Sequence, residues 1–114
     1  MKEEVQPIVE NSKTTEIHLV QFHTEHRYVT CNNIEKLSKE TIKGNNQISF
    51  VLYNVDDEKN AKVAEQFEAT GTSLYLYNSK TKATKDLTEM AFMYAKNEGA
   101  KFKTELQKEI SAFN

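Results

Sequence analysis

Four short runs rich in apolar, β-branched and aromatic residues constrain the fold most, because the distances between them differ. The gaps after the first and second runs can each hold a helix, whereas only a polar link at 78–81 separates the third run from the fourth. Parallel strands need a long crossover, and antiparallel strands accept a tight turn. The spacing therefore predicts an early parallel pair and a late antiparallel hairpin, from the runs 17–23, 47–55, 73–77 and 82–87.

Helical periodicity between and after these runs predicts four helices. Each of the first three is followed by a glycine, and we expect Gly44, Gly71 and Gly99 to be left-handed C-caps. The last helix has a narrow apolar stripe, which we expect to pack against the domain rather than against a partner or a membrane. This stripe on the last helix consists of Phe102, Leu106, Ile110 and Phe113. The first helix has a comparable apolar face, which consists of Cys31, Ile34, Leu37 and Ile42.

The order of these elements, β-α-β-α-β-β-α-α, predicts the fold class. It is typical of an α/β domain with a mixed four-stranded sheet and helices on both faces. A chain of 114 residues matches one domain. We expect residues 1–15 to be a polar N-terminal lead-in and residues 16–114 to form the single domain.

Charge, hydropathy and cysteine count exclude several classes of function. Fifteen basic and seventeen acidic residues give a net charge of −2, so we expect no nucleic-acid partner. No apolar run approaches the roughly 20 residues of a membrane span. A single cysteine excludes an internal disulfide and a multi-cysteine zinc site in one chain. The polar N-terminal segment predicts a cytoplasmic location, and a periplasmic or extracytoplasmic one stays open if a signal peptide was removed.

Reactive side chains concentrate in the segment that follows the first strand. In open α/β sheets, sites lie beyond the carboxyl ends of strands, next to the following helix N-terminus. Here this segment contains His23, His26, Arg27 and the only cysteine, Cys31. It is the predicted functional site.

The same segment matches the pattern of a known family at Phe22, His23, Arg27, Thr30 and Cys31. That pattern is a strand ending in Phe-His-x-Thr, then Arg-Cys-x-Thr-Cys and a helix. The chain resembles the thioredoxin-like bacterial family of nitrophenyl compound nitroreductase subunits of the ArsF type, which its name associates with arsenic operons. The resemblance covers residues 17 to 113, extends less specifically through 54–56 and 71–74, and implies a thioredoxin-like fold.

Two departures from the family pattern bear on chemistry. Tyr28 replaces the first cysteine of the C-x-x-C motif, so that the motif reads Arg27, Tyr28, Val29, Thr30, Cys31. In thioredoxin-like enzymes the first thiol is the nucleophile and the second resolves the mixed disulfide, and a phenol cannot exchange thiols. The second departure is Thr72, which occupies the position where thioredoxins have a cis-proline. The resemblance therefore implies that dithiol-disulfide catalysis is lost.

Cys31 leaves three interpretations open. Its place on an apolar helix face favours a buried structural thiol, and a redox sensor or mixed-disulfide site is the alternative. A metal site would have to combine it with His23 and His26, with a further ligand from Glu25 or Glu35, and we expect none. Hydrolytic Cys-His catalysis lacks an orienting residue. Acidic residues 56–58 are expected to cap a helix rather than to hold a metal ion.

These observations predict a non-catalytic binding or accessory subunit without a cofactor. We expect an unidentified protein partner to contact the loop 23–31, with His23, His26, Arg27 and Tyr28, together with Thr72 and Ser73. One alternative is a single-cysteine redox protein that uses Cys31. The other is a subunit of a nitro-compound reductase, which would need a cofactor-bearing partner because the chain has no Gly-x-Gly-x-x-Gly fingerprint.

Overall fold

The computed structural model describes residues 16–26 and 29–113. The expected lead-in 1–15 lies outside the described residues. The elements follow one another as predicted, with one short 3₁₀ helix (η1) added before α3. In order they are β1 (Ile17–His23), α2 (Val29–Ile42), β2 (Ile48–Asn54), η1 (Glu58–Asn60), α3 (Ala61–Phe67), β3 (Ser73–Asn78), β4 (Thr84–Asp86), α4 (Thr88–Ala95) and α5 (Gly99–Ala112).

The sheet has the strand order β2-β1-β3-β4. β1 pairs with β2 in parallel, and β3 pairs antiparallel with both β1 and β4. The early parallel pair and the late hairpin are thereby confirmed. Strand β1 is central and is buried from His18 to Phe22, as expected of a strand covered on both faces.

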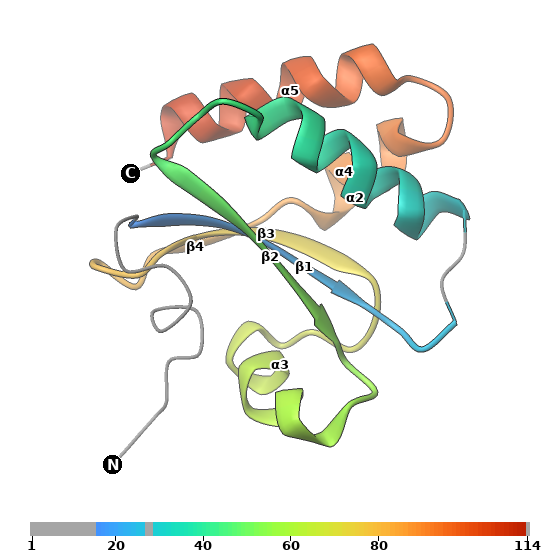
Figure 1. Cartoon of the computed structure of the whole chain (residues 1–114), viewed down its shortest axis with the longest axis vertical. Coiled ribbons are helices and arrows are strands. Elements are labelled where there is room, and N and C mark those ends of the chain that lie inside the picture. Colours follow the sequence, from blue (N-terminus) through green and yellow to red (C-terminus); the bar gives the residue numbers. More distant parts are fainter. Residues whose placement is uncertain (1–15, 27–28, 114) are drawn as a thin grey trace.

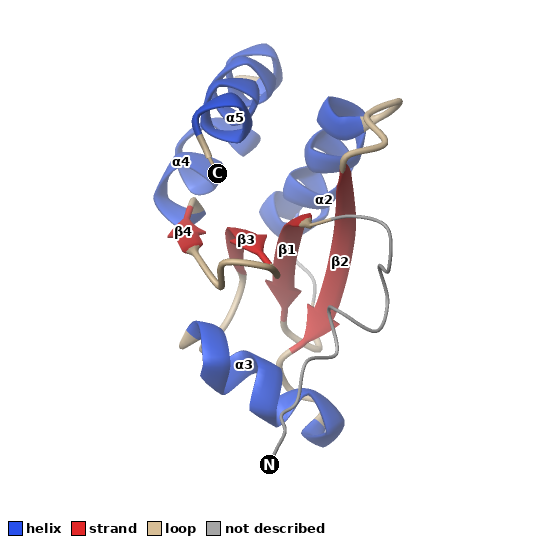
Figure 2. Ribbon diagram, turned by 90° about the vertical axis from the view of Figure 1, so that its left-hand side faces the viewer, coloured by secondary structure: helices blue, strands red, loops and turns tan. Residues whose placement is uncertain are grey.

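Helices cover the two faces of the sheet unequally. Helices α2, α4 and α5 lie on one side and α3 lies on the other (Figure 1), and the edge-on view in Figure 2 shows the same layers. Alternate residues of each strand point to opposite faces. On β3, Leu74 and Leu76 belong to the core under α2, α4 and α5, whereas Tyr75 and Tyr77 belong to the core under α3.

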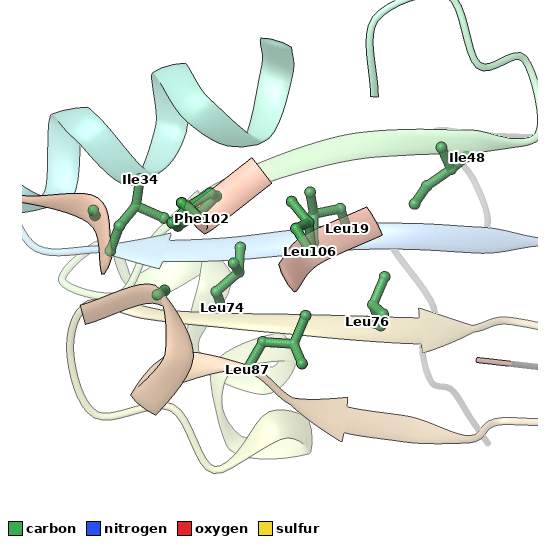
Figure 3. Close-up of a cluster of buried hydrophobic side chains, with 10 residues drawn as sticks. Leu19, Ile34, Ile48, Leu74, Leu76, Leu87, Phe102 and Leu106 are labelled. Atoms are coloured by element: carbon green, nitrogen blue, oxygen red, sulfur yellow. The ribbon is translucent and has the colours of Figure 1, made fainter. Parts of the chain in front are cut away.

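The larger core lies under three helices and includes the apolar stripe of α5. Phe102 and Leu106 are fully buried there, beside Leu19 and Leu74 (Figure 3). Ile110 and Phe113 are partly buried against the same cluster. The stripe therefore packs against the domain, as the sequence predicts. None of the described helices is long and apolar enough to cross a membrane.

Two of the three glycine predictions are wrong. Gly44 has a φ of 84° after α2, as expected, but Gly71 and Gly99 do not have a positive φ. Helix α3 ends earlier, and Glu68 takes the left-handed C-cap instead, with a φ of 59°. Gly99 begins α5 rather than ending α4, and a Cβ there would lie 3.2 Å from a methyl carbon of Leu37. Close packing between α2 and α5 therefore explains this glycine.

Carboxylates stand at two helix starts, and the first of these lies in the acidic stretch 56–58 that was expected to cap a helix. Asp57 is the N-cap of η1, and its side chain accepts a hydrogen bond from the backbone N–H of Lys59. Asp86 accepts one at 2.9 Å from the backbone N–H of Thr88, the first residue of α4. Each bond satisfies a donor that a helix terminus leaves unpaired.

Candidate functional site

The predicted site segments meet at one end of the sheet. Strand β1 ends at His23, and α2 begins six residues later at Val29. Because β3 runs antiparallel to β1, its first residue, Ser73, pairs with Phe22. The turn before β3, with Thr72, therefore lies beside the loop that leaves β1. The fold brings these two segments together although about fifty residues of chain separate them.

Hydrogen bonds join the loop after β1 to the end of β2. The backbone N–H of Glu25 donates to Asp56 Oδ2 at 2.8 Å, and Asn54 Nδ2 donates to Glu25 Oε1 at 2.9 Å. The backbone N–H of Val55 donates to the carbonyl of His23 at 2.8 Å. These bonds fix Glu25 in the loop. Asp56 is therefore a structural anchor rather than a helix cap.

The two histidines of this loop make local contacts. Nδ1 of His23 lies 2.8 Å from the backbone carbonyl of Thr24, so this nitrogen carries the proton. His26 is exposed, and its backbone carbonyl accepts a hydrogen bond from the Thr24 hydroxyl at 2.6 Å. Among residues 16–26 and 29–113, no group of three or more metal-ligating side chains could hold a metal ion.

The degenerate motif is described in part. Arg27 and Tyr28 lie outside the described residues. Val29 is 72% exposed at the first position of α2, whereas Cys31, two residues later, is only 2% exposed. The two side chains leave opposite sides of the same helical turn. Burial of Cys31 agrees with its predicted position on the apolar face of the helix.

A residue that the sequence analysis missed faces Cys31. Gln21, fully buried on β1, donates from Nε2 to the backbone carbonyl of Cys31 at 3.0 Å, and the same nitrogen lies 3.5 Å from Cys31 Sγ. A glutamine in a mostly apolar strand was the available signal. The amide attaches the first turn of α2 to the centre of the sheet.

The turn before β3 is also held by internal bonds. The Ser73 side chain is buried, and its hydroxyl donates to the carbonyl of Gly71 at 3.1 Å. The peptide bond that precedes Thr72, between Gly71 and Thr72, is trans. Tyr75 follows on the α3 face, where burial raises the pKa of its phenol above the ordinary value.

A second buried polar residue that the sequence did not single out is His18, at the other end of β1. Its Nδ1 lies 2.9 Å from the Ser49 hydroxyl, and its ring lies 6.1 Å from that of Tyr77. Burial lowers the pKa of His18 below 6.5. This residue is remote from the candidate site and bears on stability rather than on chemistry there.

Comparisons with known proteins identify the fold. No protein-family model and no curated protein matches the sequence. Three structures of human ERp44 are similar: form I with a TM-score of 0.63 and 14% identity, form II with 0.59 and 12%, and the zinc-bound form with 0.56 and 13%. Each match covers 94% of this chain and between 28% and 30% of the ERp44 chain. At this identity the likeness shows the fold alone, and that fold is thioredoxin-like.

Proposed function

We propose that this chain is a thioredoxin-like binding or accessory domain that does not exchange thiols with disulfides. The observation that carries the proposal is the state of its single cysteine. Cys31 is 2% exposed and has no second cysteine in the chain with which to form a disulfide. Thiol exchange needs a thiolate that a disulfide can reach in line.

The proposed partner surface is the end of the sheet around the loop 23–31 and Thr72. Glu25, His26 and Val29 are its exposed residues within the part of the chain that the structure describes. Ser73 is buried and positions the turn rather than contacting a partner. Bonds from Asn54 and Asp56 hold the loop in place before binding, and preorganisation of this kind lowers the entropic cost of association. A net charge of −2 favours a protein partner over a nucleic acid.

Alkylation of Cys31 tests the loss of thiol chemistry. The rate of reaction with iodoacetamide is measured against pH in the native protein and in the urea-unfolded protein. We expect reaction only on unfolding, and no reduction of insulin disulfides by the native protein. Rapid native alkylation together with insulin reduction would overturn the proposal.

Site-specific photocrosslinking tests the surface. A photoreactive amino acid replaces His26 in one variant and Lys80 in a matched control, since Lys80 lies in the exposed turn at the opposite end of the sheet. We expect a discrete crosslinked partner from position 26, which excess unlabelled protein competes away and Val29→Asp abolishes. Equal crosslinking from position 80 would refute this surface.

The family resemblance supports a second candidate, an accessory subunit of a nitro-compound reductase. It depends on the match at Phe22, His23, Thr30 and Cys31, together with Arg27. In that case the partner crosslinked from position 26 carries a flavin or nicotinamide cofactor. Absorbance of a bound flavin in the purified complex, with reduction of a nitroaromatic compound, distinguishes this candidate from a plain binding domain.

A further inference from the structure

Gln21 and Cys31 form a buried polar pair with one unused hydrogen-bonding atom. Nε2 of Gln21 lies 3.0 Å from the carbonyl oxygen of Cys31 and 3.5 Å from its Sγ. The other atom of this amide, Oε1, is buried and has no hydrogen-bond partner within the part of the chain that the structure describes. The bond to the Cys31 carbonyl fixes which end of the amide is the nitrogen, because two carbonyl oxygens would repel each other.

A buried acceptor without a donor is uncommon and costly, and it indicates a missing partner. Oε1 belongs to the same amide as Nε2, which lies 3.5 Å from Sγ. A thiol is only a weak donor. A hydroxyl group attached to the sulfur would be a strong donor on the atom that this amide contacts.

We propose that Cys31 is a site of oxidation, at which a hydroperoxide converts the thiol to a sulfenic acid that Gln21 holds. The sulfur attacks the terminal oxygen of the peroxide, an S–O bond forms and the O–O bond breaks. The sulfur loses two electrons and the peroxide gains them; the thiol proton passes to the departing oxygen, which leaves as water or an alcohol. The new S–OH group donates to Gln21 Oε1, while Nε2 keeps its bond to the Cys31 carbonyl.

Two features favour a sulfenic acid as the product that persists. A sulfenic acid is normally consumed by condensation with a second thiol, and this chain has no other cysteine. With Cys31 only 2% exposed, bulky thiols such as glutathione are kept from the sulfur, whereas hydrogen peroxide is about the size of two water molecules. This oxidation goes beyond the proposed binding function and does not depend on it.

The test uses the native full chain and hydrogen peroxide. Peroxide acts on the folded protein and is removed with catalase; the protein is then unfolded in urea that contains dimedone, which reacts with sulfenic acids, and the adduct is located by peptide mass spectrometry. Methionines such as the exposed Met93 also take up oxygen, so Cys31→Ser is the control. We expect a dimedone adduct on Cys31 of the protein that was oxidised while folded. An adduct that forms only when peroxide is added after unfolding would overturn the proposal.

The role of Gln21 is tested by the lifetime of the sulfenic acid after peroxide is removed. We expect Gln21→Met, which keeps the size and removes the amide, to shorten that lifetime about three- to tenfold, the effect of one lost hydrogen bond. Ser38→Ala is the matched control, because Ser38 is also a buried polar residue and lies on α2 about two turns from Cys31. Equal lifetimes in the wild type and Gln21→Met would refute the assignment to Gln21. If Gln21→Met does not fold, the adduct on the wild type decides the proposal.

Discussion

The Gln21 amide predicts an unusual result, a buried polar residue whose replacement stabilises the protein. Gln21→Met removes the bond to the Cys31 carbonyl, and such a bond contributes about 0.5–1.5 kcal/mol net. The same change also removes Oε1, a buried acceptor that has no partner among the described residues and whose burial costs about 1–3 kcal/mol. The second effect is larger. The Cys31 carbonyl can still accept from the helix amide four residues on.

The surroundings of Gln21 support this sign. Its register partner on β3 is the fully buried Leu74, and on β2 it pairs with Leu52. A methionine side chain of similar volume packs against leucines without new strain. We therefore expect reduced Gln21→Met to be more stable than the wild type by about 1 kcal/mol, which corresponds to a rise in Tm of roughly 4–8 °C for a domain of about this size.

Urea unfolding followed by circular dichroism measures this difference. The midpoint should rise while the slope m stays constant, because the surface exposed on unfolding is unchanged. Gln21→Ala is the matched comparison, and it should destabilise by about 2–4 kcal/mol because it leaves a cavity. Destabilisation by Gln21→Met of more than about 1 kcal/mol would show that Oε1 has a partner in solution, and the reasoning would fail.

Three further predictions concern the rest of the fold. Burial lowers the pKa of His18 below its value in the unfolded chain, so the unfolded state binds the proton first and the free energy of unfolding should fall as the pH drops below 6.5. In urea midpoints measured against pH, His18→Phe should flatten this dependence. In urea unfolding, Phe102→Ala should lower the free energy of unfolding by about 3–5 kcal/mol, whereas Phe92→Ala, at a residue that is 45% exposed, should lower it by less than about 1 kcal/mol. Similar losses in the two variants would contradict the packing of α5. Gly44→Ala should lower the free energy of unfolding by about 1 kcal/mol because of the φ of 84° alone, since a Cβ there meets no atom within 4 Å. Asparagine accepts a positive φ more readily than alanine, so Gly44→Asn should recover part of this loss in thermal melts.

The layout of this fold was predictable because it depends on spacing. The short link at 78–81 could only connect antiparallel neighbours, and the chain between residues 23 and 48 was long enough for a crossover. Alternation along β3 accounts in the same way for Tyr75 and Tyr77, which both lie in the core under α3. Such patterns are local and repeat over several residues, so single exceptions do not obscure them.

Single residues were harder to interpret, because their roles depend on contacts across the fold. Gly99 resembled a helix end, but its reason is a methyl group of Leu37 that is distant in sequence. Asp56 resembled a helix cap and instead accepts from the backbone of Glu25. Gln21 gave no signal beyond its polarity, because its partner lies on a helix that packs over the strand.

The proposed partner surface and the proposed oxidation site share the first turn of α2. Val29 faces solvent and Cys31 faces Gln21, so an oxygen atom added to Sγ must be accommodated between β1 and this turn. Adding an atom to a packed site costs about 1–3 kcal/mol unless a neighbour moves. We expect the start of α2 to move, because its exposed residue Val29 is not packed in the core.

Oxidation should therefore weaken partner binding. A displacement worth about 1 kcal/mol at the interface reduces affinity roughly fivefold. The crosslinking yield from position 26 should fall by that factor after peroxide treatment, whereas Cys31→Ser protein should not respond. If Cys31 is fully converted to the sulfenic acid and the yield does not change, Gln21 has absorbed the added oxygen without moving α2, and the two sites act independently.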